Sequence, residues 1–251
     1  MVFSAIRKIK KNLKLLQAML FSYKILKPFD KGWFKGKRVV IIGGADSVLH
    51  EKLGEYIDGF DVVVRVNKGV DIIEQQHEFV GQRTDVLFHA FYVRDNDATS
   101  SPITIDLWKK HSVDKLIFAH NYACSDYSLF NFLYFLKVSK RKFKFSQLPK
   151  QLLDKSHKAV FPAGPTTGFT AINTIFNCKP KELYITGFTF SKTPNNKLYR
   201  DITLENLNEI WGVSKAHDVE REYVYIKNIY NKNRGVVKVD AVLENIFIKE
   251  S

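Results

Sequence analysis

The strongest restraint on the fold of this chain is a series of short apolar segments that alternate with segments of helical character. Short apolar runs bounded by turn residues are typical of buried strands. They occupy residues 38–42, 61–66, 85–89, 115–119, 182–186 and 236–239. Helices are predicted at residues 48–57, 103–110, 127–138, 167–178 and 218–230. This alternation predicts an α/β fold with a Rossmann-like, mostly parallel sheet that helices cover on both faces.

In an open parallel sheet, ligands bind beyond the carboxyl ends of the strands. The residues that follow the predicted strands are therefore the candidate site: residues 43–47, Asn67, His89, residues 120–121 and residues 187–192. The polar, proline-containing segment at residues 189–199 would form a flexible loop or lid next to that site.

Composition narrows the classes of protein. Apolar residues make up 45% of the 251 residues, and 20 Phe and 11 Tyr are present, which excludes a disordered chain. Two cysteines cannot form a disulfide scaffold, and they suit a reducing compartment. A net charge of +13 indicates an anionic partner, which could be nucleic acid, an acidic membrane or an anionic substrate.

The positive charge is concentrated at the amino terminus. Residues 1–38 contain eleven Lys and Arg and one acidic residue, whereas the rest of the chain contains 28 basic and 25 acidic residues. The body is therefore only mildly basic. Since no zinc-finger, RNP or helix-turn-helix motif is present either, we expect no nucleic-acid partner.

The amino-terminal segment is also amphipathic. Its apolar residues follow one helical stripe, with the lysines off that stripe: Val2, Ile6, Ile9, Leu13, Leu16 and Leu20. Residues 15–23 are the longest charge-free run, far short of the ~20 residues that span a bilayer, and no signal-peptide cleavage site follows. The pattern favours a helix in the plane of an anionic membrane surface; a helix packed on the body is the alternative. We predict a membrane-associating segment (1–36), with contact through residues 1–27, and a globular domain (37–251).

Two strand ends carry residues suited to nucleotide binding. Gly43 and Gly44 would let a ligand approach the backbone, although an ordinary strand-to-helix turn also fits. Neither a Gly-x-Gly-x-x-Gly nor a Gly-x-x-x-x-Gly-Lys motif is present, which argues against a dinucleotide dehydrogenase and a P-loop enzyme. Asn67 could bind a base or ribose, or form a turn before Lys68 and Gly69.

An anion site is predicted at Gly164-Pro165-Thr166-Thr167-Gly168, which precedes an apolar helix. The hydroxyls of Thr166 and Thr167 and the backbone N–H groups of a helix start suit a phosphate or a carboxylate. The alternative is a capping threonine beside a loop glycine, but the cluster holds more than capping needs.

A candidate general base is His217, near the start of a predicted helix with Ser214 as a possible N-cap. A helix N-terminus disfavours imidazolium, so it would keep His217 neutral and able to accept a proton. Glu222 lies about 140° around the helix from His217, and not directly beneath it. The alternative is a solvated surface histidine in a highly charged segment.

The signals for a metal are weak. Asp95-Asn96-Asp97 could be the metal clamp of nucleotide-diphosphate glycosyltransferases, but its neighbours favour a polar loop. The histidines lack the spacing of a zinc site. Cys124 and Cys178 are expected to be buried thiols and not nucleophiles. We therefore expect neither a metal nor another cofactor.

Taken in order, three segments resemble the motifs of glycosyltransferase family 29, the sialyltransferases. Residues 39–67 resemble the large motif of that family, residues 165–188 its small motif, and His217-x-x-x-x-Glu222 its very small motif. The layout is also similar to the bacterial sialyltransferase family 42. Gly44 stands where the family usually has Asn, and Val39 where it has a Cys, so the disulfide of secretory-pathway members cannot form.

The resemblance implies an inverting, metal-independent glycosyltransferase of the sialyltransferase-type GT-A variant fold. The donor would be a CMP-linked acidic sugar, either sialic acid or Kdo. His217 would be the general base, supported by Glu222. Donor-binding residues carried over by position are Gly43, Gly44, Asn67, Thr166, Thr167, Gly168 and, as a loose match to the third motif, Tyr199.

The expected acceptor is a glycan or glycolipid, such as a bacterial lipo-oligosaccharide or capsule precursor. We expect a role in lipopolysaccharide biosynthesis, with the protein peripheral on the inner, cytoplasmic face of the cell membrane. One alternative is a metal-dependent transferase of nucleotide-diphosphate sugars that uses Asp95 and Asp97. The other is a non-catalytic membrane-binding protein.

Overall fold

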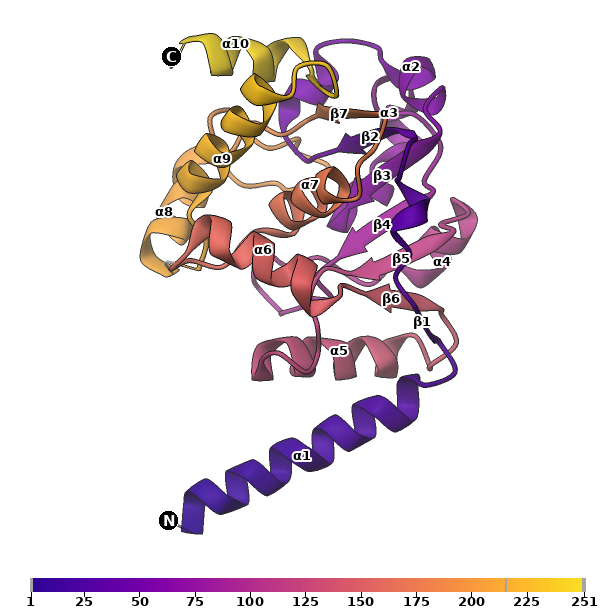
Figure 1. Cartoon of the computed structure of the whole chain (residues 1–251), viewed down its shortest axis with the longest axis vertical. Coiled ribbons are helices and arrows are strands. Elements are labelled where there is room, and N and C mark those ends of the chain that lie inside the picture. Colours follow the sequence, from indigo (N-terminus) through magenta and orange to yellow (C-terminus); the bar gives the residue numbers. More distant parts are fainter. Residues whose placement is uncertain (1, 215, 250–251) are drawn as a thin grey trace.

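The computed structural model describes residues 2–214 and 216–249, and within them eight parallel strands form one sheet in the order β1-β6-β5-β4-β3-β2-β7-β8. The strands are β1 (Leu26–Lys27), β2 (Arg38–Ile42), β3 (Val62–Val66), β4 (Val86–His89), β5 (Lys115–Phe118), β6 (Phe145–Gln147), β7 (Glu182–Thr186) and β8 (Val237–Val239). The predicted α/β fold with a parallel sheet is confirmed (Figure 1).

Helices cover both faces of the sheet. The described helices are α1 (Val2–Ser22), α2 (Gly54–Asp58), α3 (Ile73–Val80), α4 (Ile105–Lys110), α5 (Asp126–Val138), α6 (Lys150–Val160), α7 (Thr167–Asn177), α8 (Leu204–Ser214), α9 (Val219–Lys232) and α10 (Ala241–Lys249). Alternate residues of β2 face opposite layers: Val39 and Ile41 pack with α7 and α9, whereas Val40 and Ile42 pack with α2. Two-sided burial explains why most residues of the central strands are apolar.

The chain reverses direction across the sheet at β2. From β2 it runs through β3, β4 and β5 to β6, which lies beside the edge strand β1, and it then returns to place β7 and β8 on the other side of β2. A crevice forms at the carboxyl ends of strands where the order reverses, and this is where open α/β sheets bind ligands.

Some predicted elements differ from the structure. Residues 48–57 form two short pieces, the 3-10 helix η2 (Asp46–Leu49) and α2, and not one helix. Gly54 starts α2 so close to α3 that a Cβ on it would lie 2.2 Å from the His77 carbonyl oxygen. The sequence did not predict β1, β6, α3, α6, α8 or α10.

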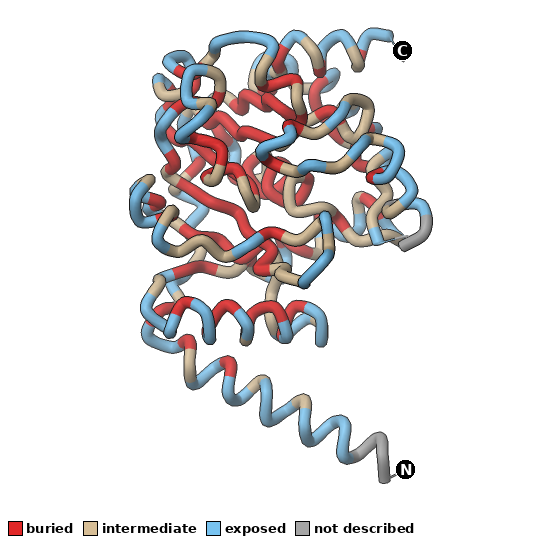
Figure 2. Tube along the Cα trace, turned by 180° about the vertical axis from the view of Figure 1, so that it is seen from behind, coloured by how far each residue is buried: buried red, intermediate tan, exposed pale blue. Residues whose placement is uncertain are grey.

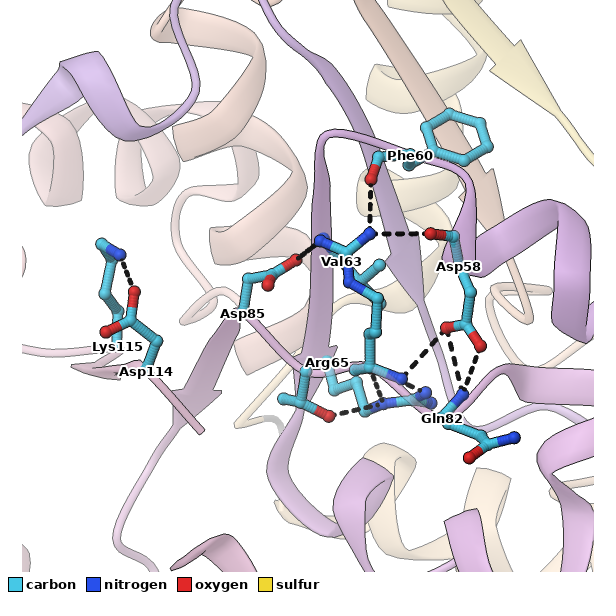
Figure 3. A network of polar contacts seen from close by, with 10 residues as sticks. Asp58, Phe60, Val63, Arg65, Gln82, Asp85, Asp114 and Lys115 are labelled. Carbon is cyan, nitrogen blue, oxygen red and sulfur yellow. Dashed lines mark hydrogen bonds and ion pairs between the residues drawn. The ribbon is translucent and has the colours of Figure 1, made fainter. Parts of the chain in front are cut away.

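A buried arginine on β3 holds the connection to β4 (Figure 3). Arg65 is fully buried and donates to the carbonyls of Val80 and Gly81 at 2.7 and 2.8 Å and to Thr84 Oγ1 at 3.0 Å. Nearby, the Asp58 carboxylate accepts the backbone N–H of Gln82 at 2.9 Å. Burial lowers the pKa of Arg65 to about 10, so the side chain stays charged at neutral pH. Arg65 is therefore a structural residue, although it lies within the motif-like segment that ends at Asn67.

Helix α1 packs on α5 through the side opposite its apolar stripe. Leu15 and Ala18 join the aromatic core under α5, and Lys11 forms a 2.7 Å ion pair with Asp126. The stripe itself faces outward, with Leu13 61% and Ile9 59% exposed, and Figure 2 shows α1 as exposed along most of its length. The helix thus packs on the body, yet its apolar stripe is uncovered. None of the described helices is both long and apolar enough to cross a membrane.

Candidate active site

A cavity of about 1160 Å³ opens at the carboxyl ends of the central strands. It is bounded by segments that follow β2, β3, β4, β5 and β7, by the start of α7 and by the residues around the start of α9. The predicted site residues that line it are Gly44, Asn67, Thr166, Thr167, Gly168, Tyr199, His217 and Glu222. Gly43 lies behind the cavity lining, where a Cβ would be 2.2 Å from the Gly187 carbonyl oxygen. Its role in this structure is close packing of two backbones.

His217 lies one residue before the N-cap of α9. The cap is Asp218, whose carboxylate accepts the Arg221 backbone N–H at 3.0 Å. The expected cap Ser214 is wrong, because that residue ends α8 and the chain turns between the two helices.

The imidazole of His217 is held in one tautomer. Its Nδ1 atom lies 2.8 Å from the Gly164 carbonyl oxygen. A carbonyl can only accept, so Nδ1 carries the hydrogen in this contact and Nε2 of the neutral ring carries the lone pair. Gly164 also donates its N–H to the Ala216 carbonyl at 2.9 Å, which fixes the two loops to each other. Burial lowers the pKa of His217, and the charge of Arg200 lowers it further. This histidine can accept a proton at neutral pH.

Glu222 is 2% exposed and ties α9 to the start of α7. Its carboxyl group accepts from the backbone N–H of Thr166 at 2.6 Å and lies 2.8 Å from Thr166 Oγ1. Burial raises the pKa of Glu222 to about 8, against the opposing effect of these two contacts. Glu222 therefore positions Thr166 and does not contact His217 in the manner of a catalytic dyad.

Thr166 is the N-cap of α7, because its hydroxyl accepts the Phe169 backbone N–H at 3.1 Å. Its polar groups are thus engaged by Glu222 and Phe169. Thr167 and Gly168 form the first turn of α7, where backbone N–H groups have no acceptor within the helix. The predicted anion site therefore centres on Thr167 and Gly168. A Cβ on Gly168 would lie 2.6 Å from the Phe188 ring, so any larger residue would require that ring to move.

Tyr199 and Asn67 shape the wall formed by β2 and β3. The Tyr199 ring lies over Gly44, where an added Cβ would be 2.4 Å from the ring, and its hydroxyl donates to the Val66 carbonyl at 3.2 Å. The Asn67 carboxamide oxygen accepts the Ala90 backbone N–H at 3.1 Å. Asn67 has a positive φ of 46°, which asparagine tolerates better than most residues.

The predicted lid packs on the turn after β2. Asn196 donates its N–H to the Gly44 carbonyl at 2.9 Å, and Thr193 donates to the Asp46 carboxylate at 2.7 Å. The loop thereby carries Tyr199 and Arg200 to the cavity wall.

Sequence reasoning missed several polar residues of the cavity, among them His157 and Arg200. His157 lies on α6, which was not predicted, and Arg200 lies in an irregular segment with no local signal. Together with His120 and His217, these residues give the cavity four side chains whose nitrogen atoms can form hydrogen bonds. Desolvation lowers the pKa of His120 to about 4, and the neighbouring His157 and His217 lower it as well.

The Asp95-Asn96-Asp97 segment is irregular in structure. The Asp97 carboxylate lines the cavity but accepts from the Thr99 backbone N–H at 2.7 Å and the Thr99 hydroxyl at 2.6 Å, and from the Tyr92 hydroxyl. The described residues contain no group of three or more His, Cys, Asp or Glu arranged to hold a metal ion.

The two cysteines differ. Cys178 is buried as predicted, but the expectation for Cys124 is wrong, because this thiol is exposed and lines the cavity. Cys124 follows the carboxyl end of β5 and therefore lies at the rim of the crevice and not in the core.

A parallel sheet with a cavity at its switch point is the arrangement in which open α/β folds bind ligands. The model of glycosyltransferase family 29 (sialyltransferase) matches residues 2–234, and the chain belongs to this family.

Sialyltransferases of primates are similar to this chain in sequence, at low identity. The type 2 lactosamine alpha-2,3-sialyltransferases of Homo sapiens and Pongo abelii are 25% identical over 231 residues, which cover 78% of this chain. The chain spans 63% of the length of those relatives.

Solved structures share the fold at low identity. A mammalian sialyltransferase in complex with Gal-beta-1-3GalNAc-ortho-nitrophenol has a TM-score of 0.61 at 13% identity, over 89% of this chain and 78% of that one. The sialyltransferase CstII from Campylobacter jejuni, in complex with the substrate analogue CMP-3FNeuAc, has a TM-score of 0.50 at 14% identity, over 81% of this chain and 80% of that one.

Proposed function

We propose that the chain is an inverting, metal-independent sialyltransferase that moves an acidic sugar from a CMP-linked donor to a hydroxyl of a glycan. The observation that carries the proposal is His217, held by Gly164 in the tautomer whose Nε2 can accept a proton inside the cavity. Membership of glycosyltransferase family 29 supports the class of reaction.

In the proposed reaction His217 Nε2 removes the proton from the acceptor hydroxyl as its oxygen attacks the anomeric carbon of the donor sugar. The bond from that carbon to the phosphate oxygen breaks on the opposite face, so the configuration inverts and CMP leaves with the bonding electrons. The N–H groups at the start of α7, at Thr167 and Gly168, stabilise the charge on the leaving phosphate. A monophosphate needs less charge compensation than a diphosphate, which supports a reaction without a divalent ion.

Glu222 stabilises the geometry of this site through its contacts with Thr166. By binding Thr166 through both backbone and hydroxyl it fixes the start of α7 relative to His217, which lies on the same short segment as the start of α9. The donor-binding start of α7 and the base His217 are thereby held in fixed positions relative to each other.

Sialic acid is the proposed donor sugar, with Kdo as the alternative. The complex of CstII with CMP-3FNeuAc supports a CMP-sialic acid donor. The named relatives act on type 2 lactosamine, so a galactose-ended glycan is the first acceptor to test. A bacterial lipo-oligosaccharide or capsule precursor remains the proposed natural acceptor.

A donor screen tests the proposal. CMP-Neu5Ac, CMP-Kdo and UDP-sugars are offered with N-acetyllactosamine in the presence of EDTA, and CMP release and product are measured. We expect transfer from CMP-Neu5Ac that EDTA does not reduce and that His217→Ala abolishes. His50→Ala, at an exposed histidine, is the matched control. Transfer from a UDP-sugar that needs Mn²⁺ would support the nucleotide-diphosphate alternative instead.

We also propose that the protein binds the inner face of the cell membrane through α1. The exposed apolar stripe, with cationic side chains beside it, is the arrangement of an in-plane amphipathic helix on an anionic leaflet.

A further inference from the structure

A second, smaller cavity lies between α1 and α5. It has a volume of about 420 Å³. Its walls combine apolar groups with cations: Ile6, Leu129, Phe130, Arg7, Lys10 and Lys14. We call this cavity the α1–α5 groove.

The charges of the groove are unbalanced. Its one carboxylate, Asp126, is bound by Lys11 at 2.7 Å and by Arg7 at 3.8 Å. Within the part of the chain that the structure describes, Lys10 and Lys14 form no ion pair. They are four residues apart and therefore lie on the same side of α1. Beside an apolar wall, this pair suits a ligand that is both anionic and amphiphilic.

Consecutive residues of α5 line the groove and the catalytic cavity. Tyr127 and Ser128 of the first turn of α5 line the large cavity, while Leu129 and Phe130 line the groove. Arg94 joins the two, because its guanidinium lies 4.8 Å from the ring centroid of Tyr92, in the large cavity, and 4.6 Å from that of Phe130.

The other side of the groove meets the exposed stripe of α1. Ile6 belongs to both, since it is 44% exposed at the end of the stripe and lines the groove. A membrane bound to the stripe would therefore lie next to the groove, and the groove next to the catalytic cavity.

We propose that the α1–α5 groove binds the phosphate-bearing, lipid-proximal part of a glycolipid acceptor while its terminal sugar reaches His217. Lys10 and Lys14 bind the phosphate, and Ile6 and Phe130 contact the adjoining lipid. This inference rests on the proposed transferase function and adds the site that binds the lipid-proximal part of the acceptor.

The test uses one acceptor oligosaccharide in two forms, free and joined to a lipid through a phosphodiester. The lipid form is placed in zwitterionic phosphatidylcholine vesicles, so that the other lipids contribute no net negative charge. The variant Lys10→Gln/Lys14→Gln is compared with Lys8→Gln/Lys24→Gln, which removes the same charge from exposed positions outside the groove. Readouts are the KM of transfer and co-sedimentation with the vesicles.

We expect the groove variant to raise the KM for the lipid-linked acceptor about 30-fold, since each lysine near an anionic lipid contributes roughly a factor of five. Its co-sedimentation should fall in parallel, while transfer to the free oligosaccharide stays at the wild-type rate. The control variant should change each value less than about twofold. Equal losses in both variants, or no loss in either, would overturn the proposal.

Two substitutions that do not change the net charge test whether the apolar side of the groove contributes to binding. Phe130→Ser should weaken co-sedimentation with the same vesicles, whereas Tyr134→Ser, one turn along α5 and also exposed, should not. If the wild type transfers to neither form of the acceptor, the proposed function has failed, and co-sedimentation still decides whether the groove binds the phosphate-linked lipid.

Discussion

Replacing Glu222 by glutamine should flatten the dependence of stability on pH without unfolding the protein. Burial raises the pKa of Glu222 from 4.5 to about 8, so between these values the folded state binds more protons than the unfolded state. Stability conferred by the protonated carboxyl is thus complete below pH 4.5 and is lost as the pH rises toward 8. At about 1.4 kcal/mol per pH unit, the loss is at most ~5 kcal/mol.

The amide of glutamine imitates the protonated carboxyl. Its oxygen can accept the Thr166 backbone N–H, and its NH₂ group can donate to Thr166 Oγ1. Glu222→Gln should therefore match the wild type near pH 5.5 and exceed it at pH 8.5 by about 3 kcal/mol. Glu222→Ala leaves the Thr166 N–H without a partner and opens a void, at a cost of roughly 3 kcal/mol relative to Glu222→Gln at either pH.

The assay is urea unfolding of each variant at pH 5.5, 7 and 8.5. Glu220→Gln is the matched control, because Glu220 lies on the same helix with a 62% exposed side chain. It should leave the pH profile unchanged. Parallel profiles for the wild type and Glu222→Gln would refute the reasoning, since they would mean that Glu222 is ionised in the folded state.

Three further outcomes are expected. The acidic limb of kcat/KM should lie below pH 6.5, because burial lowers the pKa of His217 and the neutral base is lost only as the pH falls through that value; a limb above pH 6.5 would count against His217 as the base. Arg65→Met should lower stability by about 4 kcal/mol and the thermal midpoint by roughly 10 °C, because it orphans the buried acceptors at Val80, Gly81 and Thr84, and an unchanged midpoint would contradict this role. Leu13→Glu/Leu16→Glu should abolish co-sedimentation with anionic vesicles but leave transfer to a free oligosaccharide intact, whereas retained binding would show that the exposed stripe is not the membrane contact.

The central sheet could be predicted because its signal is local. Strands such as β2 and β7 are buried on both faces, so most of their residues are apolar and the run stands out. Strands β1 and β6 are two and three residues long, and they pair with each other although they lie more than a hundred residues apart in the chain. No local pattern could show them.

The candidate site was predictable in its residue types but not in their contacts. The sequence pattern placed Thr166 at the start of one predicted helix and His217 near the start of a different helix. The partners that fix their roles, Glu222 for Thr166 and Gly164 for His217, are 56 and 53 residues distant. Only tertiary structure shows that the Thr166 hydroxyl is occupied and that Thr167 and Gly168 are the better anion donors.

The position of Cys124 makes the catalytic cavity chemically addressable. The chain has two thiols, and burial raises the pKa of Cys178 to about 11, so that thiol reacts slowly at neutral pH. Cys124 is exposed and lines the cavity beside His120 and Ser125. A fluorophore attached there would be single-site without any engineering, and its emission would report the filling of the cavity during turnover.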